Sequence, residues 1–419
     1  MNPSVQYFNK PMMYGSPFSA EQNMVGPTPV NAFNEPMGYN TPGNMISMEF
    51  IPSPIGFNNG RYGPIITANN GMLYVAGFGA GNYRFIKIDP TTNIITSIYE
   101  GLVPPGMSSR RLLASPTGTL IALPSFAQTV VGEFDPVTEI FSSFGTLPAG
   151  GNKTWGGVLA NNGKIYCSPF TSANIIVIDV INRTTYTIGN FGATAFKWGA
   201  PILAPNGKIY CPPYADGRVL VIDPKDDSFY FLKDDINSLA RRSTGVKYYN
   251  GILAYDGKIY CIGYGAQNIL VIDPETDTCS SFNPYLNGNL FNLFGNVFPT
   301  TGILGTNGKI YGSYWFANDT NRNNARIREF DPYTRTYSSI GIPESLNQIV
   351  LSSSAVSPGA YGGLCIAPNG KIYFAPQGSN FFAIVSGLPP ATPEMWQVPK
   401  DLSKLSTSLF NYHSNGNGI

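Results

Sequence analysis

The sequence predicts an all-β protein: a seven-bladed β-propeller with an extended N-terminal arm. Three observations favour this fold. Glycine and proline are abundant, with 46 and 35 residues in a chain of 419, which suits strands and turns better than long helices. A unit of four short apolar runs recurs seven times, and the same turn residues separate the runs in most copies. Radial repetition of four-stranded sheets is the architecture of a propeller.

The repeat is most regular in the second apolar run of each copy, which carries a pair such as Ile-Tyr. The second residues of successive pairs lie 47, 45, 44, 50, 51 and 62 positions apart. A spacing of 44 to 51 residues fits one blade, and an insertion around residues 343–358 explains the longest step. A second insertion, residues 234–247, lies between the fourth and fifth blades. The pairs end at Tyr74, Ile121, Tyr166, Tyr210, Tyr260, Tyr311 and Tyr373.

Two kinds of turn separate the runs. Asn-Gly or Asp-Gly stands between the first and second runs, as at Asn206-Gly207, and supplies the positive φ angles of a tight hairpin. An aspartate, usually followed by proline, ends the third run, and its carboxylate can accept hydrogen bonds from turn amides. Because equivalent positions in six blades cannot form a single active site, we interpret these carboxylates as turn residues. They are Asp89, Asp135, Asp179, Asp223, Asp273 and Asp331.

These motifs resemble known propeller repeats. VIDPETDT at Val271–Thr278 and APNGKIY at Ala204–Tyr210 are similar to YVTN-type, kelch-like and virginiamycin-lyase-like repeats. The resemblance covers the blades, residues 55–399, and excludes the arm. It implies the fold and leaves the activity open, because propellers include lactonases, lyases, adhesins, scaffolds and virion proteins.

Charge and composition exclude several classes of function. The net charge is +1 and charged residues make up 12% of the chain, about half the average of roughly 25%, so no nucleic-acid partner is expected. No apolar run approaches the length of a membrane span, and no signal peptide is seen. We expect a virion location if the protein is viral and a cytoplasmic one otherwise. The five cysteines lack disulfide or zinc spacing.

The inventory of reactive residues argues against catalysis. The single histidine, His413, lies beyond the last blade, so the blades hold no histidine base or metal ligand. Cys167, Cys211 and Cys261 occupy equivalent places in three blades, as core cysteines would. The first strands are apolar and offer no ring of carboxylates for a metal ion. We therefore expect no catalytic residue, no metal and no cofactor.

A candidate ligand site lies at the start of the first strands. Eight or nine residues before each hairpin glycine, the chain has an aromatic residue in five of seven blades. Basic residues adjoin most of them, and aromatic residues recur where the second strand ends. This ring could bind a carbohydrate or a small anion, or its members could be wedges between blades. The candidate ligand-binding residues are Tyr62, Arg110, Trp155, Lys197, Trp198, Tyr249, Trp315 and Tyr361, and the seventh blade-start position is Thr300.

The arm, residues 1–54, contains a duplicated motif. Residues 8–17 and 33–42 are identical at six of ten positions and rich in groups that fill shallow pockets on a protein. We interpret the two motifs as docking segments, through which residues 1–50 bind protein subunits of a larger assembly. The alternative interpretation is that the arm is a low-complexity leader and the similarity of the motifs is accidental. The docking residues are Phe8, Pro11, Met12, Tyr14 and Pro17, with Phe33, Pro36, Met37, Tyr39 and Pro42.

The sequence therefore predicts an arm (1–54), a propeller (55–399) and a tail (400–419). The expected function is non-catalytic: the arm anchors the propeller in a larger assembly, such as a virion capsid or tail. The arm resembles those of virion structural proteins. The alternatives are a lactonase- or lyase-type enzyme and a glycan-binding lectin or adhesin. A chain starting near Ile55 is expected to stay folded, with Met395–Val398 as the last outer strand. Met48–Pro52 is the one arm segment that could add a closing strand.

Overall fold

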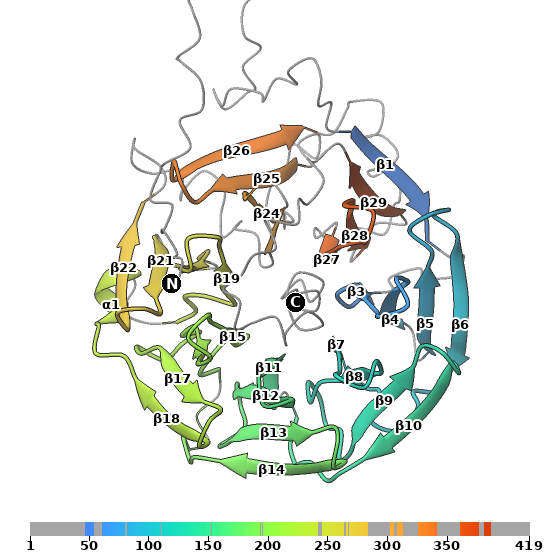
Figure 1. Cartoon of the computed structure of the whole chain (residues 1–419), viewed down its shortest axis with the longest axis horizontal. Helices are drawn as coiled ribbons and strands as arrows, with labels where there is room; N and C mark the ends of the chain where they lie inside the picture. The colour runs from blue at the N-terminus through green and yellow to red at the C-terminus, as the bar shows by residue number, and fades with distance from the viewer. Residues whose placement is uncertain are drawn as a thin grey trace, which may run out of the picture. The chain divides into compact units, whose positions relative to one another are not determined.

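Seven antiparallel β-sheets, arranged as the blades of a ring, make up the described part of the chain (Figure 1). The computed structural model describes residues 47–53, 61–79, 82–109, 111–151, 153–192, 194, 196–241, 245–263, 265–266, 268–283, 302–305, 308–312, 326–341, 361–376 and 381–386. The seven-bladed propeller predicted from the sequence is confirmed.

In the first six blades consecutive strands pair, from the first strand nearest the centre of the ring to the last at the rim (Figure 1). The first blade contains β2 (Arg61–Tyr62), β3 (Ile66–Thr67), β4 (Leu73–Gly79), β5 (Asn82–Ile88) and β6 (Ile95–Gly101). The second contains β7 (Leu112–Ala114), β8 (Leu120–Ala122), β9 (Val131–Asp135) and β10 (Ile140–Phe144). The third contains β11 (Thr154–Leu159), β12 (Lys164–Pro169), β13 (Ile175–Asp179) and β14 (Thr184–Ile188).

The next three blades follow the same plan. The fourth contains β15 (Ile202–Leu203), β16 (Ile209–Cys211), β17 (Leu220–Asp223) and β18 (Ser228–Phe231). The fifth contains β19 (Ile252–Leu253), β20 (Ile259–Cys261), β21 (Ile269–Asp273) and β22 (Thr278–Phe282). The sixth contains β23 (Gly302–Leu304), β24 (Ile310–Gly312), β25 (Arg326–Asp331) and β26 (Thr336–Gly341). The seventh blade contains β27 (Tyr361–Ile366), β28 (Ile372–Pro376), β29 (Phe381–Ser386) and, at its outer edge, β1 (Ser47–Pro52).

The predicted turns form as their residues dictate. Gly207 has a φ of +82° in the hairpin between β15 and β16, a conformation that glycine adopts without steric strain. Asp135 accepts a hydrogen bond from the Val137 amide at 2.8 Å and another from the Thr138 hydroxyl at 2.8 Å. The same carboxylate-to-amide bond recurs at the other aspartates of this position, which are therefore turn residues as predicted.

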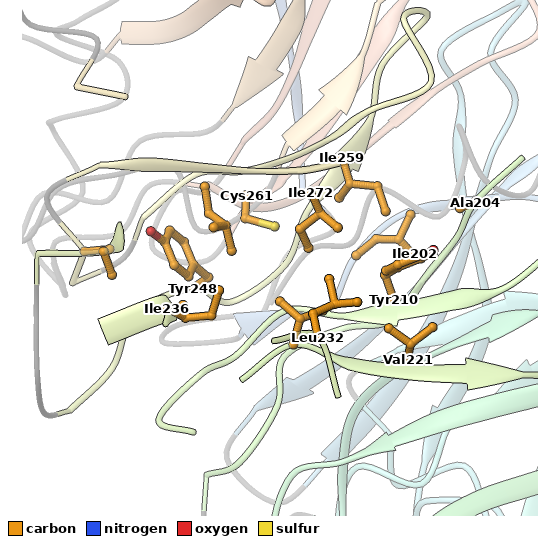
Figure 2. Packing of buried hydrophobic residues seen from close by; sticks show 14 residues of the cluster. Ile202, Ala204, Tyr210, Val221, Leu232, Ile236, Tyr248, Ile259, Cys261 and Ile272 are labelled. Carbon is orange, nitrogen blue, oxygen red and sulfur yellow. The ribbon is translucent and has the colours of Figure 1, made fainter. Parts of the chain in front are cut away.

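The core lies between neighbouring blades. Figure 2 shows one such cluster, in which Ile202 and Tyr210 of the fourth blade pack near Ile259, Cys261 and Ile272 of the fifth. All five side chains are fully buried or nearly so. Cys167 and Cys211 are equally buried in their own clusters, so these cysteines are core residues, as the sequence indicated.

Side chains of several hairpin turns also tie a blade to the next one. In the third blade, the Asn162 amide donates to the Pro224 carbonyl of the fourth blade at 2.8 Å and to its own blade's Tyr166 hydroxyl at 2.9 Å. Tyr166 in turn donates to the Asp227 carboxylate of the fourth blade. The repeated Asn-Gly therefore joins blades as well as turning the chain. Equivalent bonds are made by Asn206 to Pro274 and by Asn369 to Pro90.

Replacing Asp277 by Asn is expected to weaken the junction between the fourth and fifth blades. This carboxylate accepts from Tyr210 at 2.5 Å and from Tyr230 at 2.6 Å, and Lys208 lies 3.4 Å away. Since 34% of its side chain is exposed, the loss should be about 1 kcal/mol, at the low end for hydrogen bonds to a charged group.

The same variant should show a defined pH dependence. Burial raises the pKa of Asp277, but the tyrosine hydrogen bonds and the Lys208 charge outweigh it and hold the pKa below its ordinary value of 3.8. Because the pKa of Asp277 is lower in the folded protein than in the unfolded chain, the ionised carboxylate stabilises the fold above pH 3.8. This contribution is lost as the pH falls through the pKa of Asp277 in the folded protein. Thermal melts of both proteins should differ at pH 7, and the difference should shrink as the pH falls below 3.8; a constant difference would contradict the assignment.

The ring is closed by a strand from the N-terminal side of the chain. β1 pairs antiparallel with β29 from Ser47 opposite Ser386 to Pro52 opposite Phe381. Ile51 packs against the cluster between the seventh and first blades, and Glu49 accepts a hydrogen bond from Asn93 of the first blade at 3.1 Å. The last sheet thus joins the two ends of the propeller sequence.

This closure corrects the expectation that a chain starting near Ile55 contains the whole ring. The fourth strand of the seventh sheet is β1, from the segment assigned to the arm, and Met395–Val398 lies outside the described residues. Residues 48–52, the one arm segment expected to be able to add a closing strand, form most of β1, although they lie far from the last repeat in sequence and carry no blade motif.

The described residues of the insertion, 234–241 and 245–247, include a short helix that packs against the blades. This helix is α1 (Ile236–Leu239), whose Asp235 cap accepts from the Asn237 amide. Ile236 and Ala240 are buried between the fourth and fifth blades. The other insertion, 343–358, lies outside the described residues. Across the described parts of the chain, no helix has the length and apolarity needed to span a membrane.

Candidate functional site: an aromatic cluster at the blade starts

The predicted ring of blade-start residues combines two adjacent positions of the strand. Thr154, Trp198 and Tyr248 each pair with the residue three places after the second-run tyrosine of their blade. Trp155 and Tyr249 lie one residue further along, beside an extra residue in the first strand. Neighbouring residues of an extended strand point to opposite sides, so the two sets face different surroundings.

Trp198 belongs to the core and not to a ligand site, which corrects its prediction. Its side chain is 1% exposed and packs between the third and fourth blades. The indole stacks on Phe231 at 5.8 Å, and its N–H donates to the Arg218 carbonyl at 2.9 Å. Tyr248 is its buried equivalent in the fifth blade. At this position the alternative interpretation, a wedge between blades, is the correct one.

Lys197 is also buried, so its prediction as a residue in direct contact with a ligand is corrected. It is 5% exposed and its ammonium donates to the Gly192 and Thr194 carbonyls. Lys153 and Lys247 are equally buried and bind loop carbonyls in the same manner. Burial lowers the pKa of Lys153 and of Lys197. These three cations hold the loops at the blade starts in place.

Trp155 and Tyr249 belong to a cluster of five aromatic rings, which we call the aromatic cluster. Trp155 stacks on Tyr249 with centroids 5.0 Å apart, although the two come from the third and fifth blades. In the fourth blade the equivalent residue is Gly199, where an added Cβ would lie 2.0 Å from the Tyr249 carbonyl oxygen. The absence of a side chain there brings the two rings together. The other members are Phe170, Phe196 and Tyr214.

Polar groups lie within the aromatic cluster. The Arg111 guanidinium of the second blade lies over the Trp155 ring, 5.1 Å from its centroid. The Tyr214 and Tyr249 hydroxyls are 3.3 Å apart. The Trp155 indole N–H is buried and makes no hydrogen bond within the structure. A buried donor of this kind costs free energy, about 1 to 3 kcal/mol, that an acceptor from outside could recover.

Phe196 is the member that the sequence analysis missed. It has a φ of +64°, an uncommon conformation for a bulky side chain, and 47% of it is exposed. Its ring packs against Phe170 at 5.1 Å and Tyr214 at 6.1 Å. Phe196 stands in a loop outside the repeated strands, so counting from the hairpin glycines could not find it. Its proximity to Lys197 was the only available signal.

The remaining candidates are distributed as follows. Tyr62 lies in β2 and Tyr361 in β27, at the pairing level of Trp198. The docking residues of the arm, together with Arg110, Thr300 and Trp315, lie outside the described residues. Burial raises the pKa of the Cys167 and Cys211 thiols. No group of three or more His, Cys, Asp or Glu side chains suited to a metal ion occurs among the residues that the structure describes.

Comparison with solved structures relates this fold to other propellers. The chain is similar to a streptogramin B lyase, at 15% identity and a TM-score of 0.61, over 81% of this chain and 97% of that one. It is similar to virginiamycin B lyase from Staphylococcus aureus, at 14% identity and a TM-score of 0.62, over 82% and 99%. The extracellular domain of a hybrid two-component system from B. thetaiotaomicron matches at 15% identity and a TM-score of 0.55, over 83% and 44%.

These identities show the fold alone. No protein-family model matches the chain, and no curated protein sequence matches it either. The particular repeat type, YVTN-type or kelch-like, stays a prediction. Fold and comparisons together identify the chain as a seven-bladed β-propeller of the general shape found in these lyases and extracellular domains.

Proposed function

We propose that this protein is a non-catalytic binding protein whose propeller is anchored in a larger protein assembly by its N-terminal arm, as a surface component of a virion capsid or tail would be. The observation that carries the proposal is the position of β1. Because β1 is a strand of the seventh sheet, the residues that precede Ser47 are joined directly to the rim of the propeller. A partner that binds the arm would thereby hold the whole ring.

The state of the reactive side chains supports a binding role. The repeated aspartates accept turn hydrogen bonds, and the Glu133 carboxylate is held by Arg183, Thr119 and Ser142. The cysteines of the second strands are buried. Each of these groups already has a structural contact, and none of them needs a substrate to explain its place.

The alternative is an enzyme of the lyase kind. The likeness to streptogramin B and virginiamycin B lyases favours it, but only at the level of the fold. A structure of the S. aureus enzyme with quinupristin carries a histidine-to-alanine change and is described as catalytically inactive. Here the one histidine is His413, in the tail. Turnover of a streptogramin B antibiotic by the purified chain would favour the enzyme.

The arm predicts how the assembly responds to mutation. Replacing Phe8, Met12 and Tyr14, or Phe33, Met37 and Tyr39, by Ala or Ser should lower incorporation of the chain into particles by far more than half. Both motifs are on one chain, so each raises the effective concentration of the other at its pocket. Incorporation is measured as the amount of chain that co-purifies with particles assembled in the source organism.

A matched control uses exposed side chains of the blades. Tyr333→Ala and Val137→Ser change residues that are 92% and 84% exposed, and should incorporate as the wild type does. If the variant with both motifs replaced also incorporates at the wild-type level, the arm is a passive leader and the proposal is wrong.

A further inference from the structure

We propose that the aromatic cluster, with Arg111 beside it, is a binding site for a carboxylated sugar, such as a sialic acid or a uronic acid. This binding function goes beyond the assembly role proposed above and does not depend on it. The argument rests on the partly exposed rings, on the positive charge beside them, and on the strained backbone that presents Phe196.

The rings offer a surface on which a sugar can stack. Phe196 is 47% exposed, and Trp155 and Tyr249 are half-buried, whereas Phe170 and Tyr214 are buried beneath them. Two buried rings therefore support three that reach solvent. Aromatic rings that carry a few polar groups are typical of ligand sites, because the rings contribute contact area while hydroxyl and N–H groups orient the ligand.

One cationic side chain lies on the cluster, and three buried lysines are joined to it through the backbone. Arg111 lies on the Trp155 ring, and the lysines are Lys153, Lys197 and Lys247. The Lys153 carbonyl accepts from the Phe170 amide, the Lys197 carbonyl from the Tyr214 amide, and the Lys247 amide donates to the Tyr214 carbonyl. These lysine side chains bind loop carbonyls.

Two of these lysines, Lys153 and Lys197, have no carboxylate partner within salt-bridge distance among the described residues. Asp216 pairs with Arg218, so it adds no net charge of its own. Lys153 and Lys197, together with the Arg111 guanidinium on the Trp155 ring, create a potential that attracts an anion. The charge distinguishes a carboxylated sugar from a neutral one.

The backbone at Phe196 indicates that exposure of this ring has a use. A positive φ costs a bulky residue free energy, and such conformations concentrate at ligand sites. Here the strained backbone places a ring that packs against Phe170 and Tyr214 and still leaves 47% of the side chain exposed. Glycine at this position would adopt the same backbone without strain.

The test uses Phe196→Gly in the full-length chain. Binding is measured by titration calorimetry with two matched pairs of probes: 3′-sialyllactose against lactose, and trigalacturonic acid against its methyl ester. We expect one of the acids to bind and its neutral counterpart to bind at least tenfold more weakly. Phe196→Gly should weaken binding of that acid at least tenfold while the melting temperature stays the same or rises. The two pairs distinguish a sialic acid from a uronic acid.

Tyr255→Ala is the matched control. Tyr255 is 49% exposed but follows the end of β19, away from the strand start that carries Tyr249, so its replacement should leave affinity unchanged. Equal binding of acid and neutral probes would overturn the proposed ligand class. Failure of both acids to bind at millimolar concentration, or a lowered melting temperature of Phe196→Gly with unchanged affinity, would show that the aromatic cluster only braces the blades.

Discussion

A chain that begins at Ile55 is expected to lose the closure of the ring and to melt at a temperature lower by on the order of 10 °C, with aggregation on heating. The deletion removes all six residues of β1 and the packing of Ile51 between the seventh and first blades. Loss of a large apolar contact costs about 3 to 5 kcal/mol, and each kcal/mol shifts the melting temperature of a large domain by roughly 2 to 4 °C. The edge of β29 is also left open for pairing with other chains.

The matched control is a chain that begins at Met45. It lacks both docking motifs but keeps β1, and should melt as the full-length protein does. The two truncations differ only in residues 45–54, so the comparison isolates the closing strand from the rest of the arm. Equal stability of the two would show that another segment can close the seventh sheet.

Trp198→Ala is expected to destabilise the propeller by about 3 to 5 kcal/mol, the usual cost of truncating a fully buried aromatic residue. The indole fills the space between the third and fourth blades, and the variant also leaves the Arg218 carbonyl without its donor. Urea unfolding of the purified variant measures this loss directly.

The comparison with Trp155→Ala separates the two positions that the sequence had merged. Trp155 is half-buried at the surface of the aromatic cluster, so its truncation should cost clearly less than that of Trp198. Acidic-sugar binding should respond in the opposite order, with Trp155→Ala losing affinity. A larger loss of stability for Trp155→Ala than for Trp198→Ala would reverse our assignment of core and site.

The repeat was predictable because its signals are local. Asn-Gly and Asp-Pro set the turns through backbone conformations that depend on a few adjacent residues, and their recurrence fixed the number of blades. The bonds between blades follow from the same residues but were missed. That Asn162 reaches Pro224 depends on how two sheets are placed side by side, which no local pattern contains.

The candidate site was predicted only in part, for a related reason. Strand pairing shows that the first strands carry an extra residue opposite the second strands, which is visible between Thr154 and Gly157 and reverses the side to which later residues point. Trp155 and Tyr249 lie eight residues before their hairpin glycines and Trp198 lies nine before its own, so treating the two counts as one position merged residues that point to opposite sides. The site also needed Gly199, whose importance lies in the missing side chain, and Phe196, which stands in a loop.

The pairing of β1 with β29 also determines when the protein can finish folding. Chains are made from the N-terminus, so β1 is synthesised before every blade and its partner only with the seventh. Contacts between such distant segments form late, because the loop that they close is long. During synthesis the arm therefore precedes a ring that is still open, and β1 can pair only once β29 has been made. A prematurely terminated chain would carry both docking motifs on an unclosed propeller.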